Sequence, residues 1–220
     1  MGTVYVACVS NTTNCTYVVK IQELYTGGTW SESAFYNEVC ILRQLKKTNI
    51  APKIYDAWIC RGNGYIIMDK LAGSMNQVSA RLIPLERRGT PGYDYGNKIR
   101  QNLYRKARVK LEQLHNKNIT FGDLHGGNIL VSTMNLTDPK IEVFFTDFGY
   151  AVDWNGRLDQ IVEYIRIPNI YHERFKKPTS FERAKRLDKV LLRRIILEEI
   201  AGQKKFDGLL EHPENDYWKV

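Results

Sequence analysis

The chain lacks most of the features that mark membrane, secreted or metal-binding proteins. Its 220 residues contain no apolar run near the ~20 residues that a membrane-spanning helix needs. The first residues, MGTVYVACVS, lack the basic start of a signal peptide. Only four cysteines occur, none in a CxxC pair: Cys8, Cys15, Cys40 and Cys60. We therefore expect free, largely buried thiols in a reducing, cytoplasmic compartment, with neither a disulfide nor a zinc site.

What the sequence does contain is enough apolar material for a compact fold. Hydrophobic residues make up 43% and aromatic residues 11%, so the chain can bury a sizeable core as one unit or as two small lobes. The formal charge of +8 is concentrated between residues 174 and 194. A solvated basic face is the first interpretation of this segment, and a docking surface for an acidic protein or RNA is the second. No pattern of interleaved aromatic residues supports base stacking, which argues against nucleic acid.

Two short motifs carry most of the chemical information. FGDLHGGNIL (121–130) and TDFG (146–149) supply Asp123, Asn128 and Asp147 in that order. The runs 129–131 and 141–145 between them predict two short apolar strands joined by a polar turn. A hairpin of this kind places Asn128 beside Asp147, so that two metal-binding groups face each other. Asp123 lies just outside, near a hydroxyl nucleophile, and this trio is what phosphoryl transfer from Mg-ATP requires.

These residues resemble the catalytic loop and the DFG motif of the protein-kinase-like superfamily. The resemblance implies that Asp123 accepts the proton of the acceptor hydroxyl, and that Asn128 and Asp147 hold Mg²⁺. His125, two residues after the aspartate, would be a further catalytic group near the γ-phosphate. The G-D-L-H-x-G-N form of the loop is also similar to that of aminoglycoside and choline phosphotransferases, and the small kinases of the tRNA-modifying KEOPS assembly share the glycine before the aspartate.

The chain upstream of these motifs offers a lysine and a glutamate in the order that a kinase needs. Lys20 lies near the end of the β-branched run YVVKI (17–21), in the place of the V-A-I-K lysine. Glu38 lies in the segment 31–45, whose apolar residues recur at helical spacing. The resemblance implies that Glu38 holds Lys20 against the α and β phosphates of ATP.

The same resemblance implies an adenine pocket. The run GYIIMDKL (64–71) predicts a buried strand that leads into a hinge, with Met68 as the gatekeeper. GTVYVA (2–7) resembles the end of a glycine-rich loop and the strand after it; the preceding strand and glycines are missing from the sequence, so we expect weak nucleotide binding. The residues expected to contact ATP are Gly2, Val4, Val18, Lys20, Met68, Asp69, Leu71 and Leu130.

The segment 178–202 resembles the central αF helix of kinases, with a capping box from Thr179 to Glu182. Asp188 stands where an aspartate of that helix accepts hydrogen bonds from the catalytic-loop backbone. Gly122 replaces the arginine that binds activation-segment phosphate in many kinases, so we expect activity without phosphorylation. Phe121 replaces the usual histidine, and its ring could pack against the phenylalanine of the DFG motif.

The fold that we expect is α+β and bilobal, in a single kinase-like domain over residues 1–220. A small β-rich lobe (1–68), apparently without its first strand, would lead through a hinge (69–71) into a short, mainly helical lobe (72–220). The expected function is that of a divergent Ser/Thr protein kinase that uses Mg-ATP and acts on protein hydroxyls. A small-molecule phosphotransferase and a pseudokinase scaffold are the alternatives. Compactness and divergent loops also resemble kinases of large DNA viruses, which would place the chain in a host cytoplasm.

Overall fold

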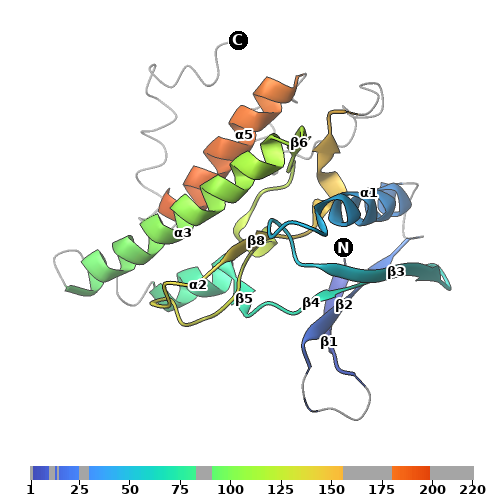
Figure 1. Ribbon diagram of the computed structural model, residues 1–220, viewed down its shortest axis with the longest axis horizontal. Helices are drawn as coiled ribbons and strands as arrows, with labels where there is room; N and C mark the ends of the chain where they lie inside the picture. Colours follow the sequence, from blue (N-terminus) through green and yellow to red (C-terminus); the bar gives the residue numbers. More distant parts are fainter. Residues whose placement is uncertain are drawn as a thin grey trace.

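The computed structural model describes residues 2–9, 13, 15–24, 30–82, 91–155 and 180–198, and its ribbon is drawn in Figure 1. Four antiparallel strands and one helix come first along the chain, and a mainly helical part with short strands follows. The principal elements are β1 (Gly2–Ala7), β2 (Tyr17–Glu23), α1 (Trp30–Leu45), β3 (Ile54–Cys60), β4 (Asn63–Asp69), β5 (Gly73–Ser74), α2 (Met75–Leu82), α3 (Pro91–His115), β6 (Ile119–Thr120), β7 (Ile129–Val131), β8 (Val143–Phe145), β9 (Val152–Asp153) and α5 (Phe181–Arg193).

The N-terminal sheet has the strand order β1-β2-β4-β3, and every neighbouring pair is antiparallel. Residues alternate between its two faces, so that Ile66 and Met68 of β4 are buried while the residues between them are half-buried. The register sets Lys20 of β2 between Val4 of β1 and Ile66 of β4. Lys20 therefore belongs to the buried face of the sheet.

Helix α1 forms where the sequence predicts it, since it spans Trp30–Leu45 against an expected 31–45. Its residues Phe35, Val39, Leu42 and Leu45 recur at helical spacing, and all four are buried. The Phe35 ring packs so closely on β4 that a Cβ at Gly64 would overlap it. This contact anchors α1 against the sheet and fixes the position of the next turn, which carries Glu38.

The β1–β2 hairpin closes on a disulfide between Cys8 and Cys15, so the expectation of free thiols was wrong for this pair. Ala7 and Tyr17 form the last pair of the strand ladder, and the register therefore brings the residues just beyond it together. No CxxC spacing marks such a pair, because strand pairing rather than sequence proximity creates it. Cys40 and Cys60 are free as expected, but both are exposed rather than buried.

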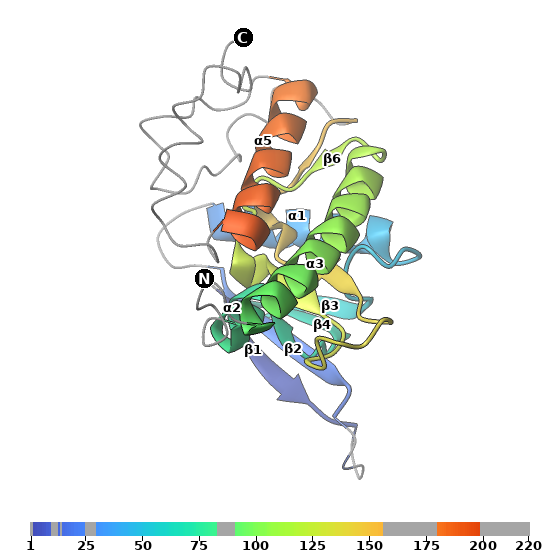
Figure 2. The ribbon, with the colours of Figure 1, turned by 90° about the vertical axis from the view of Figure 1, so that its left-hand side faces the viewer.

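The mainly helical part is built around α3 and α5, which lie side by side in both ribbon views (Figures 1 and 2). Helix α5 begins one residue later than predicted, because Ser180 rather than Thr179 is its cap and accepts a hydrogen bond from the N–H of Arg183 at 3.4 Å. A π-helical turn over Arg194–Glu198 follows α5. The remainder of the predicted helix, 199–202, lies outside the described residues. Buried faces of the two helices contribute Leu103, Ala107, Leu111, Leu187, Leu191 and Leu192 to the core.

One continuous apolar core runs from the sheet and α1 into the helical part, from Leu24 to Ile196. The chain passes between the two parts at residues 70–72, where Lys70 N–H donates to the Thr16 carbonyl at 2.8 Å and Ala72 N–H donates to that of Val131 at 3.0 Å. The fold is therefore the expected α+β arrangement of a small β-rich part and a mainly helical part. No helix within the described ranges has the length and apolar character to cross a membrane.

Candidate active site

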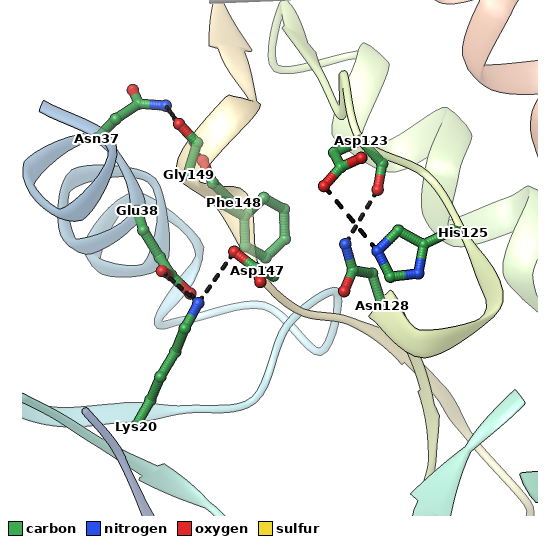
Figure 3. A network of polar contacts seen from close by, with 9 residues as sticks. All are labelled: Lys20, Asn37, Glu38, Asp123, His125, Asn128, Asp147, Phe148 and Gly149. Carbon is green, nitrogen blue, oxygen red and sulfur yellow. Dashed lines mark hydrogen bonds and ion pairs between the residues drawn. The ribbon is translucent and has the colours of Figure 1, made fainter. Parts of the chain in front are cut away.

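The β7–β8 hairpin brings the two motifs together as the sequence predicts. Ile129 pairs with Phe145, and one step further Thr146 N–H donates to the Asn128 carbonyl at 3.0 Å. Asp147 is the next residue along the chain, so it lies at the same end of the hairpin as Asn128. Figure 3 shows both side chains, with Asp147 paired to Lys20 and Asn128 bonded to Asp123.

Lys20 stands at the centre of a three-residue ion-pair network. Its Nζ lies 2.7 and 2.9 Å from the two carboxylate oxygens of Glu38, and 2.9 Å from Oδ1 of Asp147 (Figure 3). Lys20 and Glu38 are both buried, whereas the Asp147 side chain is 43% exposed. Gly2 leaves room for the lysine, because a Cβ there would lie 3.0 Å from its Cε. The strand lysine, the helix glutamate and the DFG aspartate are therefore already assembled.

The electrostatics of this network favour a charged lysine. Burial opposes the ammonium form of Lys20, but the nearby carboxylates of Glu38 and Asp147 outweigh it and raise its pKa above the ordinary value. Complete burial raises the pKa of the Glu38 carboxyl, while the Lys20 ammonium and the Phe148 N–H oppose that rise. The buried pair thus depends on both partners, because either charge left alone would be poorly solvated.

Asp147 adopts a left-handed backbone conformation, with φ 64° and ψ 67°. Few residues other than glycine take such values, and holding one there costs about 1–3 kcal/mol. Part of the compensation comes from Asn37 of α1, which the sequence reasoning missed. Its Nδ2 lies 3.1, 3.2 and 2.7 Å from the carbonyl oxygens of Phe148, Gly149 and Ala151. The only signal in the sequence is that Asn37 immediately precedes Glu38.

The catalytic loop orders itself around Asp123, Asn128 and His125. Asn128 donates from Nδ2 to the Asp123 carbonyl at 3.0 Å, which leaves its amide oxygen for another ligand. His125 caps the short turn after it, because its Nδ1 accepts a hydrogen bond from Gly127 N–H at 3.1 Å. A nitrogen that accepts carries no proton, so the ring proton lies on Nε2, 3.9 Å from Oδ2 of Asp123. His125 is about half exposed, and Asp123 is mostly covered.

Asp188 of α5 supports the loop from below, in the role that the sequence predicts. Its Oδ2 accepts hydrogen bonds from Phe121 N–H at 2.8 Å and from Nε2 of His115 at 3.0 Å. Its Oδ1 accepts from Gly122 N–H at 3.3 Å. Asp188 and His115 are buried, so these contacts are shielded from water. A carboxylate in this position fixes the main chain of Phe121 and Gly122, the two residues that precede Asp123.

The residues beside this support explain why the loop departs from H-R-D. Phe121 is completely buried, and its ring centroid lies 5.2 Å from that of Phe148. This edge-to-face contact is the one expected between Phe121 and the phenylalanine of the DFG motif. Gly122 has φ 78°, and a Cβ there would overlap the carbonyl oxygen of Tyr150. The loop therefore approaches the segment after DFG so closely that no side chain fits at residue 122.

The predicted adenine contacts line one face of the sheet and the segment after β4. Val18 pairs with Met68, on the same face as Lys20, and Met68 is 3% exposed. Leu130 of β7 is half-buried. Val4 and Gly2 lie on the neighbouring strand. Leu71 N–H has no hydrogen-bond acceptor among the described residues, although the amides on both sides of it are bonded. It is therefore available to a ligand.

Asp69, the other expected hinge contact, is tied to β3 through its side chain. Its carboxylate accepts hydrogen bonds from Lys53 N–H at 3.1 Å and from the Tyr55 hydroxyl at 2.7 Å. The bond to Asp69, with smaller contributions from burial and charge, raises the pKa of Tyr55 to about 12. The side chain of Asp69 thus anchors the end of β4, and its N–H donates to the Lys53 carbonyl at 3.1 Å, so neither is left for adenine.

The donor set fits Mg²⁺ bound together with phosphates. Within the described ranges, no three His, Cys, Asp or Glu side chains come together as a metal cluster. The Asp147 carboxylate and the Asn128 amide oxygen are hard oxygen ligands, and proteins usually bind Mg²⁺ through one or two carboxylates with substrate phosphates and water. A metal held here would therefore need the nucleotide to complete its shell.

The sheet with its lysine, the helix glutamate, the catalytic loop and the DFG hairpin together define a kinase-type phosphotransferase. The family model for the protein kinase domain matches residues 1–166, and the chain belongs to that family. A comparison with curated proteins finds no match.

Proposed function

We propose that the chain is an active protein kinase, which transfers the γ-phosphate of Mg-ATP to Ser or Thr hydroxyls of proteins. The observation that carries the proposal is the position of Lys20, whose Nζ lies within 2.9 Å of both Glu38 and Asp147. A pseudokinase would need neither the buried ion pair nor the aspartate that faces it. Burying two charges is costly unless they are paired, and this pair holds the lysine where it can position phosphates.

Each polar residue of the site has a defined role in this proposal. Lys20 orients the α and β phosphates, and Glu38 holds its ammonium in place. Asp147 and Asn128 hold Mg²⁺, which when bound neutralises charge on the phosphate oxygens. Asp123 orients the acceptor hydroxyl and takes its proton as the oxygen–phosphorus bond forms. The bond between the γ-phosphorus and the bridging oxygen breaks, and its electron pair leaves with ADP.

His125 is assigned a supporting role at the γ-phosphate end. Because its Nδ1 already accepts from Gly127, its Nε2–H is the donor that can reach an incoming phosphate oxygen or Asp123. The geometry therefore leaves Nε2 as the ring nitrogen that faces Asp123. Catalysis in this site rests mainly on positioning and on charge neutralisation.

Nucleotide binding is proposed to use the main chain of the hinge and the apolar side chains on both sides of the adenine ring. Leu71 N–H and the Asp69 carbonyl would bond the adenine edge, with Val4, Val18 and Leu130 above and below the ring. Met68 closes the back of the pocket. Gly2 would lie over the phosphates as the end of a glycine-rich loop, where its main chain can approach them closely.

A protein substrate is favoured over a small molecule because the basic segment 174–194 offers a surface for an acidic partner. Within its described part, Arg183, Arg186, Lys189 and Arg193 are exposed along α5, and Glu182 on the same helix pairs with Lys185. Residues 174–179 lie outside the described part of the chain. We propose that an acidic region of a partner docks here and presents a hydroxyl to Asp123, in an intracellular setting.

Two carboxylate variants test the proposal. Asp123→Asn is expected to lower turnover by roughly 10² or more while Mg-ATP still raises the melting temperature, because the base is lost but the nucleotide site is intact. Asp147→Asn is expected to abolish Mg-dependent turnover. Asp138→Asn, in a surface turn, is the matched control and should behave as wild type. Full activity of the Asp123 variant would refute the assignment of the catalytic loop.

The alternatives are separated by the choice of acceptor. Phosphatase-treated enzyme is expected to transfer ³²P from ATP to a protein on serine or threonine, read by phosphoamino-acid analysis. Transfer to amino alcohols or aminoglycosides but to no protein would favour a small-molecule phosphotransferase. Absence of both turnover and Mg-ATP stabilisation at millimolar nucleotide would favour a pseudokinase scaffold.

A further inference from the structure

Two side chains of α1 bond to the segment after Asp147: Glu38 accepts from the Phe148 N–H, and the Asn37 amide donates to carbonyls. Asn37 Nδ2 lies within hydrogen-bond distance of three carbonyls, those of Phe148, Gly149 and Ala151 (Figure 3 draws two of these residues). The helix also approaches in apolar contact, because a Cβ at Gly149 would lie 3.4 Å from that of Ala34. One half-buried amide therefore contacts three of the four carbonyls of residues 148–151.

This stretch begins immediately after a residue in a conformation that needs support. Asp147 has φ 64°, and its carboxylate faces Lys20 only while the backbone keeps that value. Relaxation of the following residues would let Asp147 return to a common conformation and turn its side chain away. The Glu38 carboxylate bonds to the Phe148 N–H while it pairs with Lys20, and Asn37 holds the carbonyls of Gly149 and Ala151 further along.

We propose that Asn37 is a positioning residue for Asp147: its amide holds residues 148–151 in the conformation that keeps this carboxylate on Lys20 and ready for a metal. Its effect on turnover rests on the proposed kinase function, but its effect on the main chain does not. Asn37 touches neither nucleotide nor acceptor in this scheme, so it acts only through Asp147.

The test compares two amides of the same helix. Asn37→Leu keeps the shape of the side chain but removes its donors. Gln44→Leu is the matched control, because Gln44 also reaches from α1 to the following segment but donates to the exposed side chain of Asp153, at 3.0 Å. Hydrogen exchange of the ligand-free proteins is measured in peptides that cover residues 147–152. Roughly tenfold faster exchange is expected in the Asn37 variant alone, the equivalent of one lost hydrogen bond.

A second readout separates positioning from general stability. The Mg²⁺ concentration for half-maximal stabilisation by ATP is expected to rise about tenfold in Asn37→Leu, while the ATP affinity at saturating Mg²⁺ stays within about threefold of wild type. Asn37→Ser keeps one short donor, so its exchange rate and its Mg²⁺ requirement are expected to lie between those of wild type and Asn37→Leu. This variant replaces Asn37→Leu in the test if the leucine variant does not fold.

The location of the faster exchange decides whether the proposal holds. Exchange in the Asn37 variants equal to that of Gln44→Leu overturns the proposal, and so does faster exchange spread evenly over α1 and the sheet, which is a purely structural effect. Faster exchange confined to 147–152 supports it. If that local change occurs while the wild-type protein neither turns over nor binds Mg-ATP, the positioning role stands and the kinase function fails.

Discussion

Replacing Asp188 by asparagine is the sharpest test of how the catalytic loop is supported. The carboxylate accepts three hydrogen bonds in a buried site, from Phe121 N–H, Gly122 N–H and His115 Nε2. Asparagine has the same shape but only one acceptor oxygen. With that oxygen in place of Oδ2, the bonds to Phe121 and His115 remain, and the new NH₂ group faces the Gly122 N–H.

The expected cost follows from these contacts. Hydrogen bonds to a charged group contribute about 1.5–3 kcal/mol each and neutral ones about 0.5–1.5 kcal/mol. Two bonds lose their charge and the third becomes a donor-to-donor contact, while the desolvation of the carboxylate is relieved. Together these changes lower the free energy of unfolding by about 3 kcal/mol. Asp188→Ala would leave three buried donors unpaired and cost about 5 kcal/mol, which is close to the whole stability of many domains.

Urea unfolding followed by circular dichroism measures this free energy directly. For a chain of this size, a loss of about 3 kcal/mol corresponds to a fall of about 6–12 °C in melting temperature. Asp138→Asn is the control, because that carboxylate accepts one backbone bond in a surface turn and should cost about 1 kcal/mol at most. A stability of Asp188→Asn within about 0.5 kcal/mol of wild type would refute the idea that α5 holds the loop through this side chain.

Three further predictions follow from local geometry. Gly122→Ala should lose at least about 2 kcal/mol in urea unfolding, because φ 78° strains any side chain and the new Cβ would overlap the Tyr150 carbonyl oxygen; a neutral result would contradict the close approach. Asp69→Asn should lower the Tyr55 pKa from about 12 towards 10, read from the tyrosine ¹³Cζ shift. Because folding raises this pKa, the bond's stabilisation is complete below pH 10 and disappears as pH rises through 12. Reducing the Cys8–Cys15 disulfide should lower the free energy of unfolding by about 2.5 kcal/mol, because the unfolded chain is then no longer constrained by this short loop. In Cys8→Ser, reductant should leave the free energy of unfolding unchanged.

The parts of the site that the sequence predicts well are those that local pattern controls. The runs 129–131 and 141–145 are short, apolar and separated by turn residues, so the hairpin, which brings Asn128 beside Thr146 at one end, follows from the sequence pattern alone. The spacing of apolar residues in 31–45 likewise predicts the α1 helix, and Glu38 proves to lie on its buried side. In both cases hydrophobic periodicity decides which side a residue faces.

What could not be predicted depends on strand register, on contacts between distant segments or on a choice between neighbouring caps. The Cys8–Cys15 disulfide arises from the register of β1 on β2, and a one-residue slip would have separated the two sulfurs. Asn37 reads as an ordinary polar residue of a helix, and only the path of the chain 111 residues later gives it three carbonyl partners. The cap of α5 moved from Thr179 to Ser180 because neighbouring hydroxyl residues offer nearly equal caps.

The glycine at residue 122 shows how absence of a side chain can itself organise a site. From the sequence, Gly122 only removes an arginine that could bind a phosphorylated segment. In the fold, its missing Cβ lets the Tyr150 carbonyl lie against the catalytic loop, while Asn37 holds the carbonyls on either side of it from α1. Residues 148–151 are thus held from two sides by close packing and neutral hydrogen bonds. These contacts form without a phosphate group. Gly122 also has no positively charged side chain that could bind one. We therefore predict activity without phosphorylation from what fills this space, as well as from the residue that is missing.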